Sequence, residues 1–236
     1  MPVASKVKKQ KSPDLFEIEN GLLAAEHAAL QSGVFRVAGV DEAGRGPLAG
    51  PVVAAAVMFP AACLKGEPAD IIAGIQDSKI LSAKKRAALL PEILNYPGVF
   101  VGVGCCDSTE IDELNILRAT HLAMRKALLD LKELPELALV DGLPVQGLPV
   151  DSRSMIKGDR RCFSIAAASI VAKETRDRIM RELDLKYPEY HFAQHKGYGT
   201  RKHIAALDKW GPCPIHRRSF SPVRIRETGK AEDHTP

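Results

Sequence analysis

Short apolar runs bounded by glycine and proline alternate along the chain with longer stretches of helical spacing. Four of these runs, at 37–40, 52–59, 98–106 and 137–140, are short and rich in β-branched or small residues. Their length and composition suit buried strands better than helices. The first two runs flank a charged, glycine-rich turn, so this part of the chain predicts two strands joined by an elbow.

Apolar residues three and four positions apart predict helices between and after these strands. Ser82 is a suitable N-cap for a helix toward Asn95, which Pro91 is expected to kink or shorten. The helix after Asp107 should pack one stripe on the sheet. Its members are Leu114, Leu117, His121, Met124, Leu128 and Leu131. Helices are also expected at 14–30, 164–185 and 201–210, and irregular chain at 144–155 and after Pro212.

Composition and charge narrow the class of protein. The 236 residues can bury a sizeable core, and the net charge of +4 permits a polyanionic partner without requiring one. Five cysteines lack the spacing of a zinc site, which favours free thiols in a reducing compartment. With no signal peptide and no apolar stretch long enough to cross a bilayer, we expect a soluble, cytoplasmic protein.

Acidic residues are the strongest candidates for chemistry. Asp41 and Glu42 follow the first apolar run, Asp141 ends the run at 137–140, and Asp159 precedes a helix. Ligands in open α/β sheets bind at the carboxyl ends of the strands, where these residues are expected to lie. Oxygen ligands of this kind suit Mg²⁺ or Mn²⁺, and two such ions can promote phosphodiester hydrolysis. The set favours a nuclease or a phosphotransfer enzyme.

Structural explanations compete with this interpretation. Asp141 could cap a turn before Gly142, and Asp159 could complement the dipole of the following helix. No Ser/His/Asp or Cys/His constellation is evident, and the turn GRGPLAG fits neither the GxGxxG spacing nor a Walker loop. A nucleotide-binding enzyme therefore lacks its phosphate loop.

Several basic and aromatic residues also have two explanations. Arg45 and Lys79 could bind phosphate or be solvated loop residues, and the rings of 187–200 could stack on nucleic acid or pack on the core. His121 is interpreted as a hydrogen-bonded core histidine. Four basic residues of the helix at 164–185 are interpreted as its solvated face: Lys173, Arg176, Arg178 and Arg181.

A family resemblance follows from motifs that occur in order along the chain. They are DEAGRGPLAGPVVAAAV, DSKIL, EIDELNIL, LVDG, KGD followed by IAAASIVAK and TRD, FAQHKGYGT and HRRSF. Together they resemble bacterial ribonuclease HII over residues 36 to 223 or so. The resemblance implies a ribonuclease H-like α/β fold, with a mixed central sheet flanked by helices and a small helical C-terminal part.

By the same resemblance, four acids bind two divalent cations, Mn²⁺ or Mg²⁺, and catalyse the reaction: Asp41, Glu42, Asp141 and Asp159. The turn of Gly44, Arg45 and Gly46 contacts the ribonucleotide 2′-OH and a phosphate, Lys79 binds a phosphate, and Tyr198 stacks on a sugar beyond the RNA-to-DNA junction. The implied reaction is hydrolysis of RNA in RNA/DNA hybrids and cleavage 5′ of single ribonucleotides in duplex DNA, leaving 3′-OH and 5′-phosphate ends.

The resemblance also divides the chain and implies its partners. Residues 1–33 form an extension of tail and helix, 34–223 the catalytic domain, and 224–236 a flexible tail. We expect a monomer that binds RNA/DNA hybrids and DNA duplexes that contain ribonucleotides. We do not expect it to bind a membrane. A sliding-clamp or polymerase partner stays open, as does the role of residues 1–33. The alternative function is a module that binds RNA/DNA junctions without cutting them.

Overall fold

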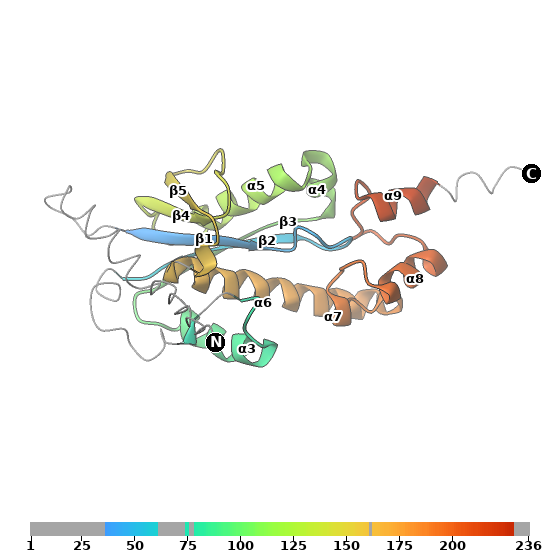
Figure 1. The fold of residues 1–236 in the computed structure, drawn as a ribbon, viewed down its shortest axis with the longest axis horizontal. Coiled ribbons are helices and arrows are strands. Elements are labelled where there is room, and N and C mark those ends of the chain that lie inside the picture. Colours follow the sequence, from blue (N-terminus) through green and yellow to red (C-terminus); the bar gives the residue numbers. More distant parts are fainter. Residues whose placement is uncertain (1–35, 61–73, 76–77, 161, 229–236) are drawn as a thin grey trace, which may run out of the picture.

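A mixed, five-stranded sheet forms the centre of the molecule (Figure 1). The computed structural model describes residues 36–60, 74–75, 78–160 and 162–228, so the expected tail and helix of residues 1–33 lie outside the described residues. The strand order is β3-β2-β1-β4-β5. The strands are β1 (Val37–Ala43), β2 (Val52–Met58), β3 (Phe100–Cys106), β4 (Leu137–Asp141) and β5 (Asp151–Met155).

The sheet combines an antiparallel and a parallel half. β2 pairs antiparallel with both β1 and β3, whereas β4 pairs parallel with β1 and β5. The helical elements are α3 (Ala83–Leu94), α4 (Ser108–Leu114), α5 (Ile116–Leu129), η2 (Gly158–Arg160), α6 (Phe163–Lys186), η3 (Pro188–Tyr190), α7 (Phe192–His195), α8 (Arg201–Trp210) and α9 (Ser221–Thr228). The prediction of a mixed sheet flanked by helices is confirmed.

Helices cover both faces of the sheet (Figure 1). α6 packs on β1 and β2 from one side, α5 packs on β2 and β3 from the other, and α3 lies on the outer side of α6. Every residue of β2 is buried because both of its faces are covered, which explains its unbroken apolar sequence. Glycines allow the close approach, since Gly102 and Gly104 face the backbone of α5 and Gly39 faces that of α6.

Substitution of Gly39 by alanine is expected to destabilise the fold by about 3 kcal/mol or more, since overpacking against backbone cannot be relieved by a side chain. The added Cβ would lie 2.1 Å from the carbonyl carbon of Ser164. Urea unfolding measures the effect. The matched control is Gly147→Ala, where no atom lies within 4 Å and only the φ of +76° is strained, for a cost of about 1 kcal/mol. Equal losses would contradict the steric explanation.

The helix expected after Asp107 is divided, and its predicted stripe is partly wrong. Asn115 has a φ of 68° and its side chain caps α5 by accepting from the N–H groups of Leu117 and Arg118, so α4 and α5 are separate helices. Leu117 is 51% exposed. Small residues of α5 face the sheet instead: Ala119, Ala123 and Ala127, beside Met124 and Leu128.

Two segments expected to be irregular contain regular structure. β5 lies within 144–155 as an edge strand, and its polar sequence lacks the apolar alternation that reveals a half-buried strand. After Pro212, α9 continues past the expected boundary at residue 223 to Thr228. Pro91 lies inside α3, which reaches Leu94, so it does not shorten the helix.

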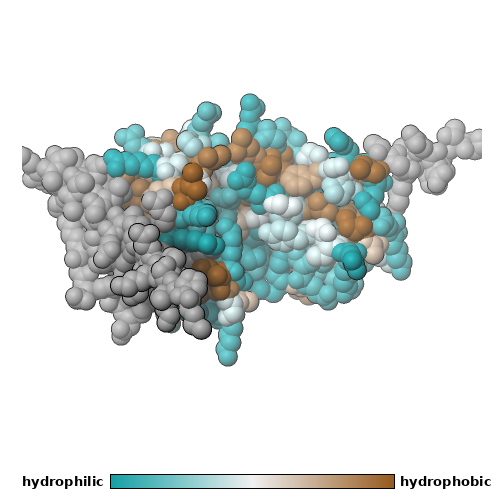
Figure 2. Space-filling view, in the orientation of Figure 1, coloured by the Kyte–Doolittle hydropathy of each residue, from teal (hydrophilic) through white to brown (hydrophobic). Residues whose placement is uncertain are grey.

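The C-terminal helices form a separate apolar cluster at one end of the sheet (Figure 1). Tyr190 and Phe192 are buried in it, with rings stacked 5.3 Å apart, so these members of the ring-rich segment pack on the core. Tyr198 differs, being 46% exposed. In the space-filling view, hydrophobic residues form separate small areas among hydrophilic ones (Figure 2). Within the described part of the chain, no helix combines the length and hydrophobicity needed to cross a membrane.

Candidate active site

The sheet register brings two of the acids together. β1 and β4 run parallel with Val40 opposite Val140, so Asp41 and Asp141, the next residues, leave the same edge on neighbouring strands. β4 pairs in turn with β5, and η2 follows β5 directly and carries Asp159. Residues that are about a hundred positions apart in the sequence therefore meet because of strand order.

Three carboxylates converge at this edge. One oxygen of each of Asp41, Asp141 and Asp159 lies within 4.8 Å of the others. The Glu42 backbone N–H donates to Asp41 Oδ1 at 2.7 Å, and the Gly158 N–H donates to Asp141 Oδ1 at 2.6 Å. Backbone donors thus hold two of the three carboxylates in place.

The electrostatic cost of this arrangement appears in the pKa values. Burial raises the pKa of Asp41 well above its ordinary value, and the negative charges of Glu42 and Asp141 raise it further. Burial also raises the pKa of Glu42, although the Arg45 guanidinium opposes the rise. Buried carboxylates that repel one another are stabilised by a cation, so the cluster is electrostatically incomplete by itself.

Glu42 lies beside this cluster and faces the glycine-rich turn. Its carboxylate lies 3.5 Å from an Arg45 guanidinium nitrogen, and half of the Arg45 side chain is exposed. Gly44 has a φ of +99°, and a Cβ there would meet the Arg176 side chain, so both conformation and space require glycine. The turn therefore presents an arginine and bare backbone next to the acids.

Lys79 reaches the acids from the segment before α3. Its Nζ lies 3.5 Å from Asp159 Oδ2, and its side chain is 74% exposed, so it borders the site on the solvent side. Buried Arg86 holds this segment by donating to the carbonyls of Ser78 and Leu81 and to Glu174 Oε1.

Tyr198 lies next to the glycine-rich turn. The Leu48 N–H donates to the Gly197 carbonyl at 2.8 Å, and the nearest atom to a Cβ on Gly46 would be Tyr198 Cε1, at 3.7 Å. The residues predicted at the site therefore lie in one region: Asp41, Glu42, Gly44, Arg45, Gly46, Lys79, Asp141, Asp159 and Tyr198. His121 is only half-buried, and burial and the charge of Arg45 lower its pKa.

Two buried arginines support these loops, and the sequence predicted neither. Arg176, interpreted as solvated, is 1% exposed and donates to the carbonyls of Ala49, Pro51 and Lys196. Arg217, from the segment expected to be irregular, is 0% exposed and donates to three carbonyls of the turn: those of Gly44 (2.6 Å), Arg45 (2.9 Å) and Gly50 (3.0 Å).

The helical spacing of apolar residues could have indicated that Arg176 is buried. It lies four residues after Ala172 and four before Met180, both buried, so it continues the buried face of α6. Arg217 has no comparable signal, because the carbonyls that it binds belong to a turn about 170 residues earlier.

Comparison with known proteins places most of the described region in one family. A family model described as Ribonuclease HII matches residues 38–223. A curated relative from Chlamydia trachomatis serovar A, named Ribonuclease HII, is 53% identical over 201 residues, which are 84% of this chain and 88% of the relative.

Solved structures agree in fold. The crystal structure of ribonuclease H2 from Pyrococcus horikoshii OT3 matches with a TM-score of 0.71 and 27% identity, and covers 84% of this chain and all of that one. Ribonuclease HII of Archaeoglobus fulgidus, solved in a complex with PCNA, matches with a TM-score of 0.64 and 26% identity, over 79% of this chain and 96% of that one. The predicted fold class is confirmed.

Proposed function

Since this chain belongs to the ribonuclease HII family, we propose that it is an endoribonuclease that cuts the RNA strand of RNA/DNA hybrids and cuts 5′ of single ribonucleotides in duplex DNA. The observation that carries the proposal is the convergence of Asp41, Asp141 and Asp159 beside the turn of Gly44 to Gly46. Water adds to the phosphorus, the bond to the 3′ oxygen breaks, and a proton passes to that oxygen. The products carry 3′-OH and 5′-phosphate ends.

The acids fit two divalent cations, Mg²⁺ or Mn²⁺. All donors are carboxylate oxygens, which these cations prefer, and burial with mutual repulsion leaves the cluster in need of positive charge. Asp41, Asp141 and Asp159 would hold the cations, and Glu42 lies beside them. Such cations lower the pKa of water and neutralise charge on a phosphodiester. The Glu42 and Gly158 N–H groups orient the carboxylates in advance.

Recognition of RNA is assigned to the glycine-rich turn and its neighbours. The 2′-OH is the group that distinguishes RNA from DNA, and Gly44 and Gly46 let a sugar approach the backbone closely. The Arg45 guanidinium, held near Glu42, is suited to a phosphate, as is the exposed ammonium of Lys79. Tyr198 adds a half-exposed ring for a sugar next to Gly46.

Alanine in place of Tyr198 is expected to lower kcat/KM on a duplex with one ribonucleotide by about 10- to 100-fold, because covering an aromatic ring with the substrate sugar contributes about 1.5–3 kcal/mol. Tyr198→Phe keeps the ring and should lose far less. The measurement is the cleavage rate of both variants on this duplex. The shift in melting temperature on adding Mn²⁺ is measured as well and should equal that of wild type. Equal activity of Tyr198→Ala and wild type would leave Tyr198 without a substrate role.

The proposed function is tested with three labelled duplexes: an RNA/DNA hybrid, DNA with one ribonucleotide, and all DNA. Each is incubated with Mg²⁺, with Mn²⁺ and with EDTA, using wild type and Asp141→Asn. We expect metal-dependent cleavage of the first two duplexes only, and loss of cleavage in the variant. Binding of the first two without cleavage in either metal would instead support the junction-binding module.

A further inference from the structure

A row of hydrogen bonds that runs through two buried histidines ends on the backbone of Tyr198. His203 Nδ1 lies 3.0 Å from the Tyr198 carbonyl oxygen, and His203 Nε2 lies 2.9 Å from His216 Nε2. The backbone N–H of Cys213 donates to His216 Nδ1 at 2.9 Å. Both imidazoles are buried, with 0% and 1% of their surface exposed. The row therefore links the segment before Arg217 to the turn that carries Tyr198.

The two ends of the row fix every proton in it. The Tyr198 carbonyl can only accept, so His203 carries its proton on Nδ1 and accepts at Nε2. His216 must then donate from Nε2 and accept at Nδ1. The Cys213 N–H can only donate, and it meets that Nδ1, so the independent end of the row agrees. The Cys213 thiol and carbonyl lie farther from Nδ1, with Sγ at 3.2 Å and the oxygen at 3.3 Å.

The surroundings favour neutral rings. Burial lowers the pKa of both His203 and His216 to about 4, and each is lowered further by a neighbouring histidine. The rings of Phe192 and Tyr190 pack around them, and His195 stacks on His203 with centroids 4.5 Å apart. Arg218 adds positive charge near His216. Neutral rings keep the direction of the row constant near pH 7.

The same turn is held from a second side. His195 accepts from the Gly197 N–H at Nδ1, 3.2 Å away, and its Nε2 lies 2.8 Å from the Tyr190 carbonyl. The backbone groups on both sides of the Gly197–Tyr198 peptide therefore have partners in the histidine cluster. Backbone held in this way restricts where the Tyr198 ring can lie.

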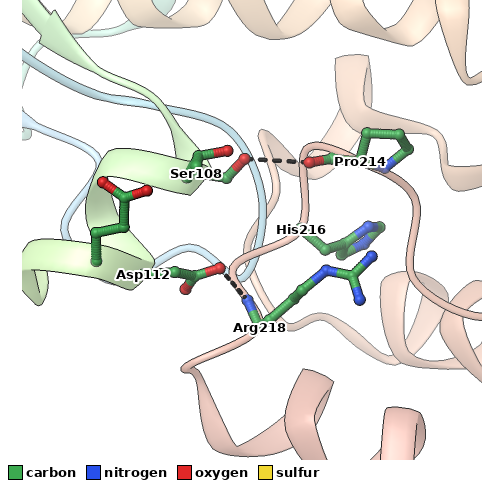
Figure 3. Close-up of a pocket in the computed structure, with 7 residues that line it drawn as sticks. Ser108, Asp112, Pro214, His216 and Arg218 are labelled. Carbon is green, nitrogen blue, oxygen red and sulfur yellow. Dashed lines mark hydrogen bonds between the residues drawn. The ribbon is translucent and has the colours of Figure 1, made fainter.

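The far end of the row is anchored to α4. Ser108 Oγ donates to the Pro214 carbonyl at 3.2 Å, and the Arg218 N–H donates to Asp112 at 2.8 Å (Figure 3). His216 lies between these two anchors and lines a pocket between α4 and residues 214–218. The segment is therefore a fixed support for the row.

We propose that His203 and His216 are positioning residues, which fix the backbone of Tyr198 through this directed row of hydrogen bonds and so hold its ring for the substrate. The inference rests on the proposed function, in which Tyr198 contacts a sugar. Neither histidine touches the substrate. Loss of the bond to the Tyr198 carbonyl should therefore raise KM for a duplex with one ribonucleotide, with a smaller effect on kcat.

The test compares two substitutions of His203. An asparagine amide nitrogen occupies the position of Nδ1 and can still donate to the Tyr198 carbonyl, whereas glutamine reaches the position of Nε2 and cannot. We expect kcat/KM of His203→Gln to fall about tenfold below that of His203→Asn, the worth of one hydrogen bond, with similar melting temperatures. In the Tyr198→Ala background this difference should disappear. Equal loss in the two variants, or persistence without the Tyr198 ring, would overturn the proposal.

A measurement on wild type keeps the proposal testable if a variant fails to fold. Nitrogen-15 NMR at pH 7 should find His203 protonated only at Nδ1 and His216 only at Nε2. Two Nε2 protons, or a charged ring, would overturn the row. This result does not depend on activity, so it is separable from failure of the proposed function, in which wild type would cleave neither the hybrid nor the duplex with one ribonucleotide.

Discussion

Asparagine in place of Asp41 is expected to lower cleavage of an RNA/DNA hybrid by at least about a thousandfold, equivalent to about 4 kcal/mol, and to make the metal-free protein more stable. The substitution keeps the size of the side chain and its acceptor for the Glu42 N–H. It removes one negative charge from a buried site where Glu42 and Asp141 repel it. A ligand for metal is lost together with a source of repulsion.

The raised pKa of Asp41 also predicts how the stability of the metal-free protein changes with pH. Because the pKa of Asp41 is raised in the folded state, the folded protein binds more protons than the unfolded chain above the ordinary carboxyl range. The metal-free wild type should therefore lose stability as the pH rises, and Asp41→Asn should lose less. Its advantage over wild type should be larger at pH 7 than at pH 4.

Urea unfolding in EDTA at the two pH values measures the stability, and cleavage with Mg²⁺ or Mn²⁺ measures the activity. The stabilisation of wild type by Mn²⁺ should be much smaller in the variant. Glu92→Gln, an exposed acid on α3, is the matched control and should change neither property. Retained activity would remove Asp41 from the metal ligands, and a loss of stability in EDTA would show that the charge has a compensating partner.

The sequence predicted the elements that have strong local patterns. β2 has seven buried residues in succession, and such a run has few alternatives to a covered strand. The two helices of 108–129 were predicted as one, because helical spacing continues through Asn115 and nothing local reveals its φ of 68°. β5 was not predicted because its residues are mostly polar and exposed, and the strand forms by pairing with β4.

The candidate site divides in the same way. Asp41 and Asp141 could be found because a buried strand that ends in a carboxylate is unusual, and parallel register then brings them together. Arg176 and Arg217 were missed because arginine is mostly a surface residue. Their burial depends on backbone carbonyls of the 44–51 turn, which only the folded chain brings to them.

Lysine in place of Arg217 is expected to destabilise the protein by about 3–5 kcal/mol and to lower kcat/KM by about a hundredfold or more. Burial and the charge of Arg176 lower the pKa of Arg217 to about 9, which still leaves it protonated at pH 7. Its guanidinium donates hydrogen bonds to the carbonyls of Gly44, Arg45 and Gly50. A single ammonium cannot span all three, and each buried carbonyl left unsatisfied costs about 1–3 kcal/mol.

The variant should fail differently from Asp41→Asn. Arg217 holds the turn of Gly44 and Arg45 and does not touch the carboxylates, so stabilisation by Mn²⁺ should persist at temperatures where the variant is folded. Unfolding in urea, the Mn²⁺-induced shift in melting temperature and cleavage of the hybrid separate the two failures. Arg218→Lys, an exposed neighbour with the same charge, is the matched control. If Arg217→Lys and Arg218→Lys lose equal stability and activity, the turn does not depend on the buried guanidinium.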